Sequence, residues 1–170
     1  MTQTPLLEVQ DLKTYFFTRS GVVKAVDGVS FSLNAGETLG IAGESGSGKS
    51  MTALSIMGLV PKPAGRIVGG RVLLNGEDLL KKTPEEMREI RGREVGMILQ
   101  DPMTSLNPLF TVGNQMIETL RLHPGHIARG LWDRAIQLLE QVKIASPQAR
   151  LRDYPHQMSG GMRQRVVGAI

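Results

Sequence analysis

The stretch that decides the fold runs from Gly43 to Ser50 and reads GESGSGKS. The apolar residues before it, Glu37–Gly43, predict a short strand, and Ser50–Leu59 after it predict a helix. Its three glycines allow the backbone to come close to phosphate oxygens, and the start of a helix presents free N–H groups to an anion. Strand, loop and helix together predict a phosphate-binding loop in an α/β protein.

Each position of this loop has an expected role in binding ATP and Mg²⁺. Lys49 is expected to contact the β and γ phosphates, and the Ser50 hydroxyl is expected to ligate Mg²⁺. The alternative is a glycine-rich turn without a ligand. The residues predicted to bind the cofactor here are Gly43, Glu44, Ser45, Gly46, Ser47, Gly48, Lys49, Ser50 and Met51.

Composition limits the classes of protein to which the chain could belong. The chain has 170 residues, of which 41% are hydrophobic and none is cysteine, so it fits one globular domain without disulfides or thiolate metal sites. The net charge is +4, but the basic residues are dispersed with acidic ones between them and only 4% of the residues are aromatic, so we expect no nucleic-acid partner. A cluster of arginines keeps that alternative open: Arg150, Arg152, Arg163 and Arg165. Without an apolar run of about 20 residues, membrane contact is expected only through a partner.

The first half of the chain predicts an antiparallel sheet with short helices. Asn75-Gly76 is a hairpin turn signal between Val72–Leu74 and Glu77–Leu79. A capping box at Thr83 followed by Pro84 predicts a helix over Pro84–Arg91. The other predicted strands are Leu6–Val9, Val22–Leu33 and Glu94–Leu99.

The second half predicts helices. Residues Val112–Leu122 form one predicted helix and Ile127–Ile144 another, followed by a loop over Ala145–Pro155 and a helix over Gly160–Ile170. The apolar face of the second helix is expected to contain Leu131, Trp132, Ala135, Ile136, Leu139 and Val142.

A second motif, MSGGMRQR at Met158–Arg165, resembles the ABC signature LSGGQ, and Gln100 in LQDPMTSLNP resembles the Q-loop glutamine. With the phosphate loop, these motifs stand in the order of ABC ATPases. The segments around them are similar to the ATP-binding subunits of dipeptide, oligopeptide and nickel importers. The resemblance implies an α/β P-loop NTPase core of ABC type. Residues 1–100 would form its antiparallel β-subdomain and phosphate-loop core, and residues 101–170 the Q-loop and helical subdomain.

The same resemblance assigns further site residues. Gln100 would act with Lys49 in catalysis and with Ser50 at Mg²⁺. In this family two ATPase subunits form a head-to-tail dimer, so Ser159, Gly160 and Gly161 would contact the γ-phosphate held by the other subunit. The departures from LSGGQ are Met158, a mild apolar exchange, and Met162, which lacks an amide.

An aromatic residue near the first strand would stack on adenine in the family. Spacing from Leu12 favours Phe16, and Tyr15 and Phe17 are the alternatives. Each of the three could instead pack within the β-subdomain.

Histidines give weaker signals. His123 and His126 flank a Pro-Gly turn with no carboxylate or cysteine nearby in sequence, which favours a surface turn over a metal site. His156 precedes the signature and has no evident catalytic partner.

The family also uses an apolar strand ending in Asp-Glu and a downstream histidine, and no apolar run ending in Asp-Glu occurs in this sequence. We therefore expect the N-terminal part of an ABC ATPase, with the C-terminal part of the core missing. Without the carboxylate that orients water, we expect ATP binding with turnover near background. Apolar faces at Met97–Leu99 and Val166–Ile170 are expected to be under-covered.

The resemblance implies an energy-coupling subunit of an importer for peptides or a related small solute, which couples ATP binding and hydrolysis to transport. Its partners would be transmembrane permease subunits at the cytoplasmic face of the cell membrane. Two alternatives stay open. One is a soluble ABC ATPase acting on nucleic acid or ribosomes, and the other is a non-enzymatic nucleotide-binding fragment.

Overall fold

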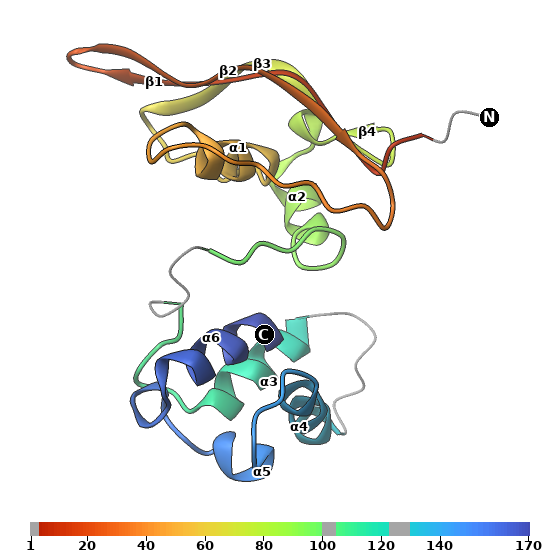
Figure 1. Cartoon of the computed structure of the whole chain (residues 1–170), viewed down its shortest axis with the longest axis vertical. Coiled ribbons are helices and arrows are strands. Elements are labelled where there is room, and N and C mark those ends of the chain that lie inside the picture. The colour runs from red at the N-terminus through yellow and green to blue at the C-terminus, as the bar shows by residue number, and fades with distance from the viewer. Residues whose placement is uncertain (1–3, 100–104, 123–129) are drawn as a thin grey trace. The chain divides into compact units, whose positions relative to one another are not determined.

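The computed structural model describes residues 4–99, 105–122 and 130–170 of the chain (Figure 1). These residues belong to two compact units, Met1–Val95 and Gly96–Ile170. Each unit has a hydrophobic core of its own, so each is described separately.

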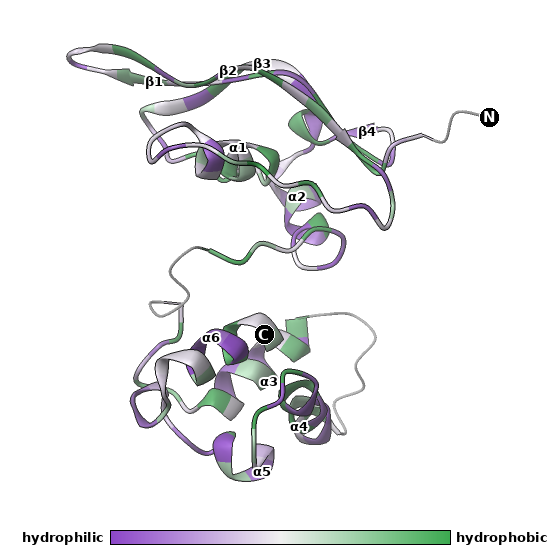
Figure 2. Ribbon diagram, viewed as in Figure 1, coloured by the Kyte–Doolittle hydropathy of each residue, from purple (hydrophilic) through white to green (hydrophobic). Residues whose placement is uncertain are grey.

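The first unit contains a four-stranded antiparallel sheet. The strands are β1 (Leu7–Thr18), β2 (Gly21–Leu33), β3 (Gly65–Leu74) and β4 (Glu77–Asp78), in the order β2-β1-β3-β4. In β2, Val29 and Phe31 are partly buried against the core while Ser30 and Ser32 are exposed, as the period of two predicts. Figure 2 shows this alternation of apolar and polar residues along the strands.

Strand β1 is longer than the predicted Leu6–Val9. A bulge at Asp11, with φ 46°, interrupts the alternation that the sequence presents. The Asp11 amide donates to Ser30 Oγ at 2.8 Å, and pairing with β2 then resumes. Because the strand is longer, the three candidate aromatic residues lie within the sheet, whereas the predicted strand would have ended before them.

Two local predictions in this unit are confirmed. Asn75 and Gly76 have φ of 50° and 86°, the left-handed pair that a tight hairpin requires, and they connect β3 to β4. Helix α2 spans Pro84–Ile90, and its capping box pairs the Glu86 amide with Thr83 Oγ1 at 3.2 Å and the Thr83 amide with Glu86 Oε2 at 2.7 Å. The backbone donor of Thr83 holds the pKa of Glu86 below its usual value.

The core of this unit forms between the sheet, the short 3₁₀ helix η1 (Leu79–Lys81) and α2. Its buried hydrophobic residues are Val9, Leu12, Val26, Val72, Leu74, Leu79, Met87 and Ile90.

Helix α1 (Lys49–Ile56) lies against one face of the sheet (Figure 1). Within the helix, the buried residues are Thr52 and Ser55. Ser55 Oγ donates to the Met51 carbonyl at 2.6 Å and lies 2.7 Å from Thr14 Oγ1 on β1. Because that hydrogen of Ser55 is used within the helix, Thr14 is the donor between them. A buried hydroxyl pair therefore joins α1 to the sheet.

The two predicted core strands do not form. Glu37–Gly43 is not a strand, and Leu39 and Ile41 are 43% and 53% exposed. In Glu94–Leu99, only Val95 makes a single bridge, to Arg91, and Ile98 is 67% exposed. A strand is completed by hydrogen bonds to a neighbouring strand, and neither segment is paired in this way within the described residues. The expected exposure of Ile98 and Leu99 is confirmed.

The second unit is helical. Its elements are α3 (Val112–Leu122), α4 (Leu131–Gln141), α5 (Pro147–Arg150), the 3₁₀ helix η3 (Pro155–Gln157) and α6 (Gly160–Ala169). Helix α3 matches its predicted bounds. Helix α4 ends before the predicted Ile144, because Lys143 adopts a left-handed φ of 57°. The predicted loop Ala145–Pro155 is wrong in part, since Pro147 starts a short helix there.

The core of this unit lies between α3, α4 and α6. Leu131, Ala135 and Leu139 are buried as predicted for α4, whereas Trp132 is 37% exposed. Val166 on α6 is fully buried, so the expectation of an under-covered face fails at this residue, and Ile170 is 40% exposed. None of the helices in residues 4–99, 105–122 and 130–170 is long and apolar enough to cross a membrane.

Candidate functional site: the phosphate loop and the signature helix

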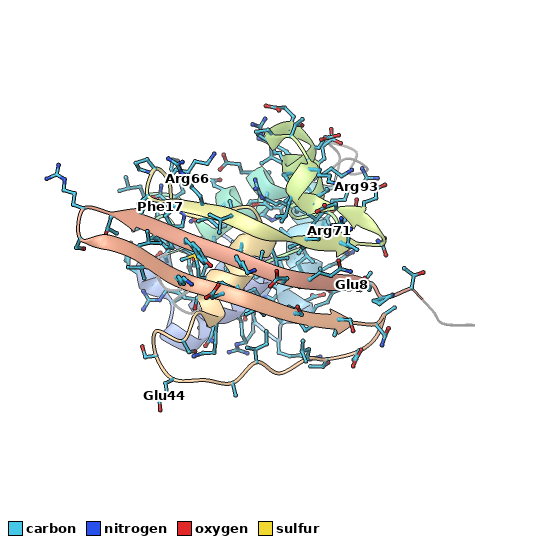
Figure 3. The ribbon with its side chains drawn as sticks, turned by 90° about the horizontal axis from the view of Figure 1, so that it is seen from above. Glu8, Phe17, Glu44, Arg66, Arg71 and Arg93 are labelled. Atoms are coloured by element: carbon cyan, nitrogen blue, oxygen red, sulfur yellow. The ribbon has the colours of Figure 1, made fainter. Side chains whose placement is uncertain are left out.

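The loop GESGSGKS is largely exposed, and its last two residues, Lys49 and Ser50, form the start of α1. Gly46 and Gly48 have φ of 83° and 93°, a backbone conformation that glycine adopts readily. The Ser47 amide donates to the Glu44 carbonyl at 3.2 Å and closes a turn within the loop. Figure 3 shows the Glu44 side chain at the outer side of this loop. Local turns and glycine dihedrals thus shape the loop as the motif predicts.

Gly48 sets the position of the helix start. A Cβ atom at Gly48 would overlap the carbonyl oxygen of Ala25 on β2, so only glycine allows the loop to approach the sheet this closely. Gly48 is also the N-cap of α1, and it has no side chain to satisfy the first amides of the helix. The first three helical residues are Lys49, Ser50 and Met51, and their N–H groups lack partners within the helix.

The Lys49 ammonium lies over the loop. Its Nζ donates to the carbonyl oxygens of Gly43 and Glu44 at 2.6 and 2.7 Å and to Ser47 Oγ at 3.2 Å. These contacts hold a positive charge beside the free amides at the positive end of the α1 dipole. The arrangement suits a phosphate group, whose oxygens accept from both the ammonium and the backbone amides.

The donor set fits Mg-ATP at this loop. Ser50 is exposed at the second position of α1 and offers a hydroxyl, a hard oxygen ligand of the type that Mg²⁺ takes together with phosphate oxygens and water. The other expected ligand, Gln100, lies outside the described residues, as do His123 and His126.

The signature motif starts helix α6. Ser159 is the N-cap, and its Oγ accepts from the Met162 amide at 3.3 Å. A Cβ atom at Gly161 would meet no atom within 4 Å, so the packing of the chain does not require glycine there. Met158 is buried at 4% exposure, which suits an apolar residue at this position. The signature motif therefore forms a capped helix start with open space beside Gly161.

The three candidate aromatics have neighbours within the sheet. A Cβ atom at Gly65 would lie 2.9 Å from Phe16 Cε1, which shows that Phe16 covers this glycine. Phe17 is 46% exposed, with the Arg66 guanidinium 5.7 Å from its ring centroid, and Figure 3 shows both residues near the end of the β1–β2 hairpin. Adenine stacking by Phe16 stays a prediction.

Tyr15 belongs to a polar cluster between β1 and β2. Its hydroxyl donates to Asp27 Oδ1 at 2.6 Å, and Lys24 Nζ donates to Asp27 Oδ2 at 3.1 Å and lies 5.4 Å from the Tyr15 ring centroid. The hydrogen bond to Asp27 raises the pKa of Tyr15, and the donors Tyr15 and Lys24 lower the pKa of Asp27.

His156 stacks on Tyr154 with ring centroids 5.6 Å apart.

Sequence reasoning missed the supports of the loop. The Ala25 carbonyl, the Thr14–Ser55 pair and the Arg91 side chain all contact the loop or α1 from distant parts of the chain. No local signal marks them, because each acts through a contact more than 20 residues away in sequence.

The geometry agrees with the comparison to known families. The sequence model of the ABC transporter family matches residues 26–169. The chain belongs to the ABC transporter family. The matched region contains both the phosphate loop and the start of α6.

Several proteins are similar to this ABC transporter chain. A probable peptide ABC transporter ATP-binding protein of Sinorhizobium fredii is 49% identical over 166 residues, which are 97% of the chain and 49% of that protein. The oligopeptide transport ATP-binding protein OppD of Bacillus subtilis is 51% identical over 167 residues, which are 98% of the chain and 47% of OppD. The chain therefore spans about half the length of these curated relatives.

Solved structures confirm the predicted fold class. The dimeric structure of MJ0796, a bacterial ABC transporter cassette, has a TM-score of 0.80 at 22% identity and covers 96% of this chain and 67% of that one. The cassette cbiO1 from Clostridium perfringens, part of the transporter complex cbiONQ, has a TM-score of 0.72 at 21% identity, covering 98% and 61%. The resemblance inferred from the three motifs is thus confirmed at the level of family and fold.

The polar cluster around Tyr15 yields a prediction. In a Tyr154→Phe background Tyr15 is the remaining tyrosine, so its titration can be followed by tyrosinate absorbance. We expect a pKa above the ordinary value of about 10, because the Asp27 carboxylate accepts the phenol hydrogen bond and opposes ionisation. Asp27→Asn should lower this pKa toward the ordinary value. Equal pKa values in the two variants would show that the hydrogen bond is absent in solution.

Proposed function

We propose that this chain is the ATP-binding, energy-coupling part of an ABC importer for peptides or a related small solute. The observation that carries the proposal is the phosphate loop, with its free amides at Lys49–Met51 and the Lys49 ammonium held over it. Relatives at about 50% identity that are named for peptide or oligopeptide transport support the solute class. ATP binding and hydrolysis in the complete protein would drive the transport step.

Residues of this chain have distinct proposed roles. Gly43–Gly48 and the amides of Lys49–Met51 bind the phosphates, Lys49 neutralises their charge, and Ser50 with Gln100 holds Mg²⁺. Bound Mg²⁺ would neutralise charge on the phosphate oxygens. Phe16 is the proposed adenine platform.

The partners follow from the second motif. Ser159, Gly160 and Gly161 would contact the ATP held by another subunit in a head-to-tail dimer, and the open space at Gly161 supports this role. Transmembrane permease subunits would hold this pair at the cytoplasmic face of the cell membrane. A soluble ATPase acting on nucleic acid, or a non-enzymatic nucleotide-binding fragment, would retain the same phosphate site.

The first prediction of the proposal concerns binding. Mg-ATP at 100 times its dissociation constant should stabilise the folded chain by about 2.7 kcal/mol, measured by thermal or urea unfolding. Lys49→Ala should remove most of this gain, because it removes the ammonium beside the phosphates. Lys62→Ala, an exposed lysine in the same unit, is the matched control and should keep the gain. A folded wild-type chain whose free energy of unfolding is the same with and without Mg-ATP would contradict the proposal.

The second prediction concerns turnover. Phosphate release by these 170 residues alone should stay near background, because no apolar run ending in Asp-Glu is present to orient the attacking water. A coupled phosphate assay on the purified chain measures this. Steady release that disappears in Lys49→Ala would show that a water-orienting group lies within the 170 residues.

The third prediction concerns the dimer. The chain contains no cysteine, so Ser45→Cys and Gly161→Cys can be made as separate proteins with one thiol each and then mixed. We expect a disulfide between the two different proteins, formed faster with Mg-ATP, because the loop of one subunit would face the signature of the other.

Gly168→Cys is the matched control for that experiment. A Cβ atom at Gly168 also meets nothing within 4 Å, but the residue lies about 10 Å further along α6. It should cross-link poorly to Ser45→Cys. Equal yields for Gly161→Cys and Gly168→Cys would reject the head-to-tail arrangement.

A further inference from the structure

At the end of α1 opposite the phosphate loop, the side chain of Arg91 donates hydrogen bonds to backbone carbonyls. The helix ends in a left-handed turn at Gly58, with φ 63°. The Gly58 amide donates to the Ser55 carbonyl at 3.0 Å and the Leu59 amide to the Leu54 carbonyl at 2.8 Å, the two bonds of a Schellman motif. The carbonyls of Met57 and Gly58 accept neither of these two bonds and lie at the negative end of the helix dipole.

Arg91 contacts both of these carbonyls. Its Nε donates to the Met57 oxygen at 2.8 Å and its Nη2 to the Gly58 oxygen at 3.2 Å. The planar guanidinium is suited to two adjacent acceptors, and a lysine would offer only a single ammonium. A fixed cation therefore stands at the carboxyl end of α1 and stabilises the helix through both hydrogen bonds and charge.

Helix α2 positions this guanidinium. Met87 and Arg91 are one turn apart, and Met87 is buried at 6% exposure. A Cβ atom at Gly58 would lie 3.1 Å from Arg91 Nη2 and 3.7 Å from Met87 Cε, so both side chains fit closely around the turn after α1. The end of α2 and the end of α1 thus meet at Gly58.

The helix depends on such contacts because it has few fully buried apolar groups of its own. Its buried residues are Thr52 and Ser55, which carry hydroxyl groups, and its apolar Met51 and Ile56 are only partly buried. Besides these two apolar residues, three contacts hold α1: Gly48 against Ala25 at its start, Ser55 with Thr14 in its middle, and Arg91 just after its end. A helix of eight residues is about 12 Å long, so a tilt at one end displaces the amides at the other.

We propose that Arg91 is a positioning residue for the phosphate site, which fixes α1 from its carboxyl end so that the amides of Lys49–Met51 stay directed at the bound phosphates. The inference rests on the proposed function, because it assumes that the loop binds ATP. Arg91 acts through the helix and does not contact the nucleotide.

The test compares Arg91→Met and Arg91→Lys with the control Arg88→Met in the whole chain. Arg88 is exposed on the same helix, three residues before Arg91, so its substitution removes the same charge without touching α1. Mg-ATP affinity is measured by titration calorimetry at a temperature where circular dichroism shows each variant folded.

We expect Arg91→Met to weaken Mg-ATP binding about fivefold or more, Arg91→Lys to weaken it less, and Arg88→Met to leave it unchanged. A merely structural role would lower the unfolding temperature of Arg91→Met but leave the affinity of the folded protein unchanged, which would overturn the inference. If Arg91→Met does not fold, Arg91→Lys decides: weaker binding supports the inference, and wild-type affinity overturns it. A wild-type chain that does not bind Mg-ATP would instead overturn the proposed function itself.

Discussion

The close approach of Gly48 to the Ala25 carbonyl is the constraint on which the phosphate site depends. It places the first turn of α1 directly on strand β2, and a side chain at position 48 would push the loop away from the sheet. The same glycine leaves the N-cap without a side-chain acceptor, so the amides of Lys49–Met51 remain available to an anion. The absence of a Cβ atom at Gly48 therefore permits the close packing and leaves these amides without a side-chain acceptor.

Around this contact, the first unit forms a frame for a short helix. The antiparallel sheet, η1 and α2 share one core, and α1 is joined to that frame by the Thr14–Ser55 hydroxyl pair and by Arg91, in addition to the partly buried Met51 and Ile56. Hydrogen bonds are directional, so the Thr14–Ser55 pair and the two bonds of Arg91 restrict the orientation of the helix axis. Such anchoring would support the proposed role of α1, whose first amides would face the bound phosphates.

The two parts of the candidate site belong to different units, each with its own core. The phosphate loop is built on the sheet, whereas the start of α6 is held by helices α3 and α4 through buried residues such as Val166 and Met158. Arg165 adds a bond to the Lys143 carbonyl at 2.8 Å, which fixes α6 beside the end of α4. The start of α6 is therefore held by a core of its own, separate from the core of the unit that contains the loop.

The sequence by itself determined the features that depend on a few adjacent residues. These include the phosphate loop, the Asn75-Gly76 turn, the capping box of α2, the bounds of α3 and the Ser159 cap of α6. Each of them is encoded by backbone preferences or by a side chain that bonds to its own turn. The family could be inferred from the same local motifs because their order and spacing are also properties of the linear chain.

Only the tertiary structure decided the rest. Apolar composition predicted strands at Glu37–Gly43 and Glu94–Leu99, but a strand exists only when a neighbour accepts its hydrogen bonds, and composition does not reveal that neighbour. The bulge at Asp11 likewise concealed the true length of β1, and with it the place of Tyr15, Phe16 and Phe17 in the sheet. The contacts of Ala25, Thr14 and Arg91 with the loop and its helix join residues far apart in the chain. They follow from the packing of whole elements, which no short stretch of sequence specifies.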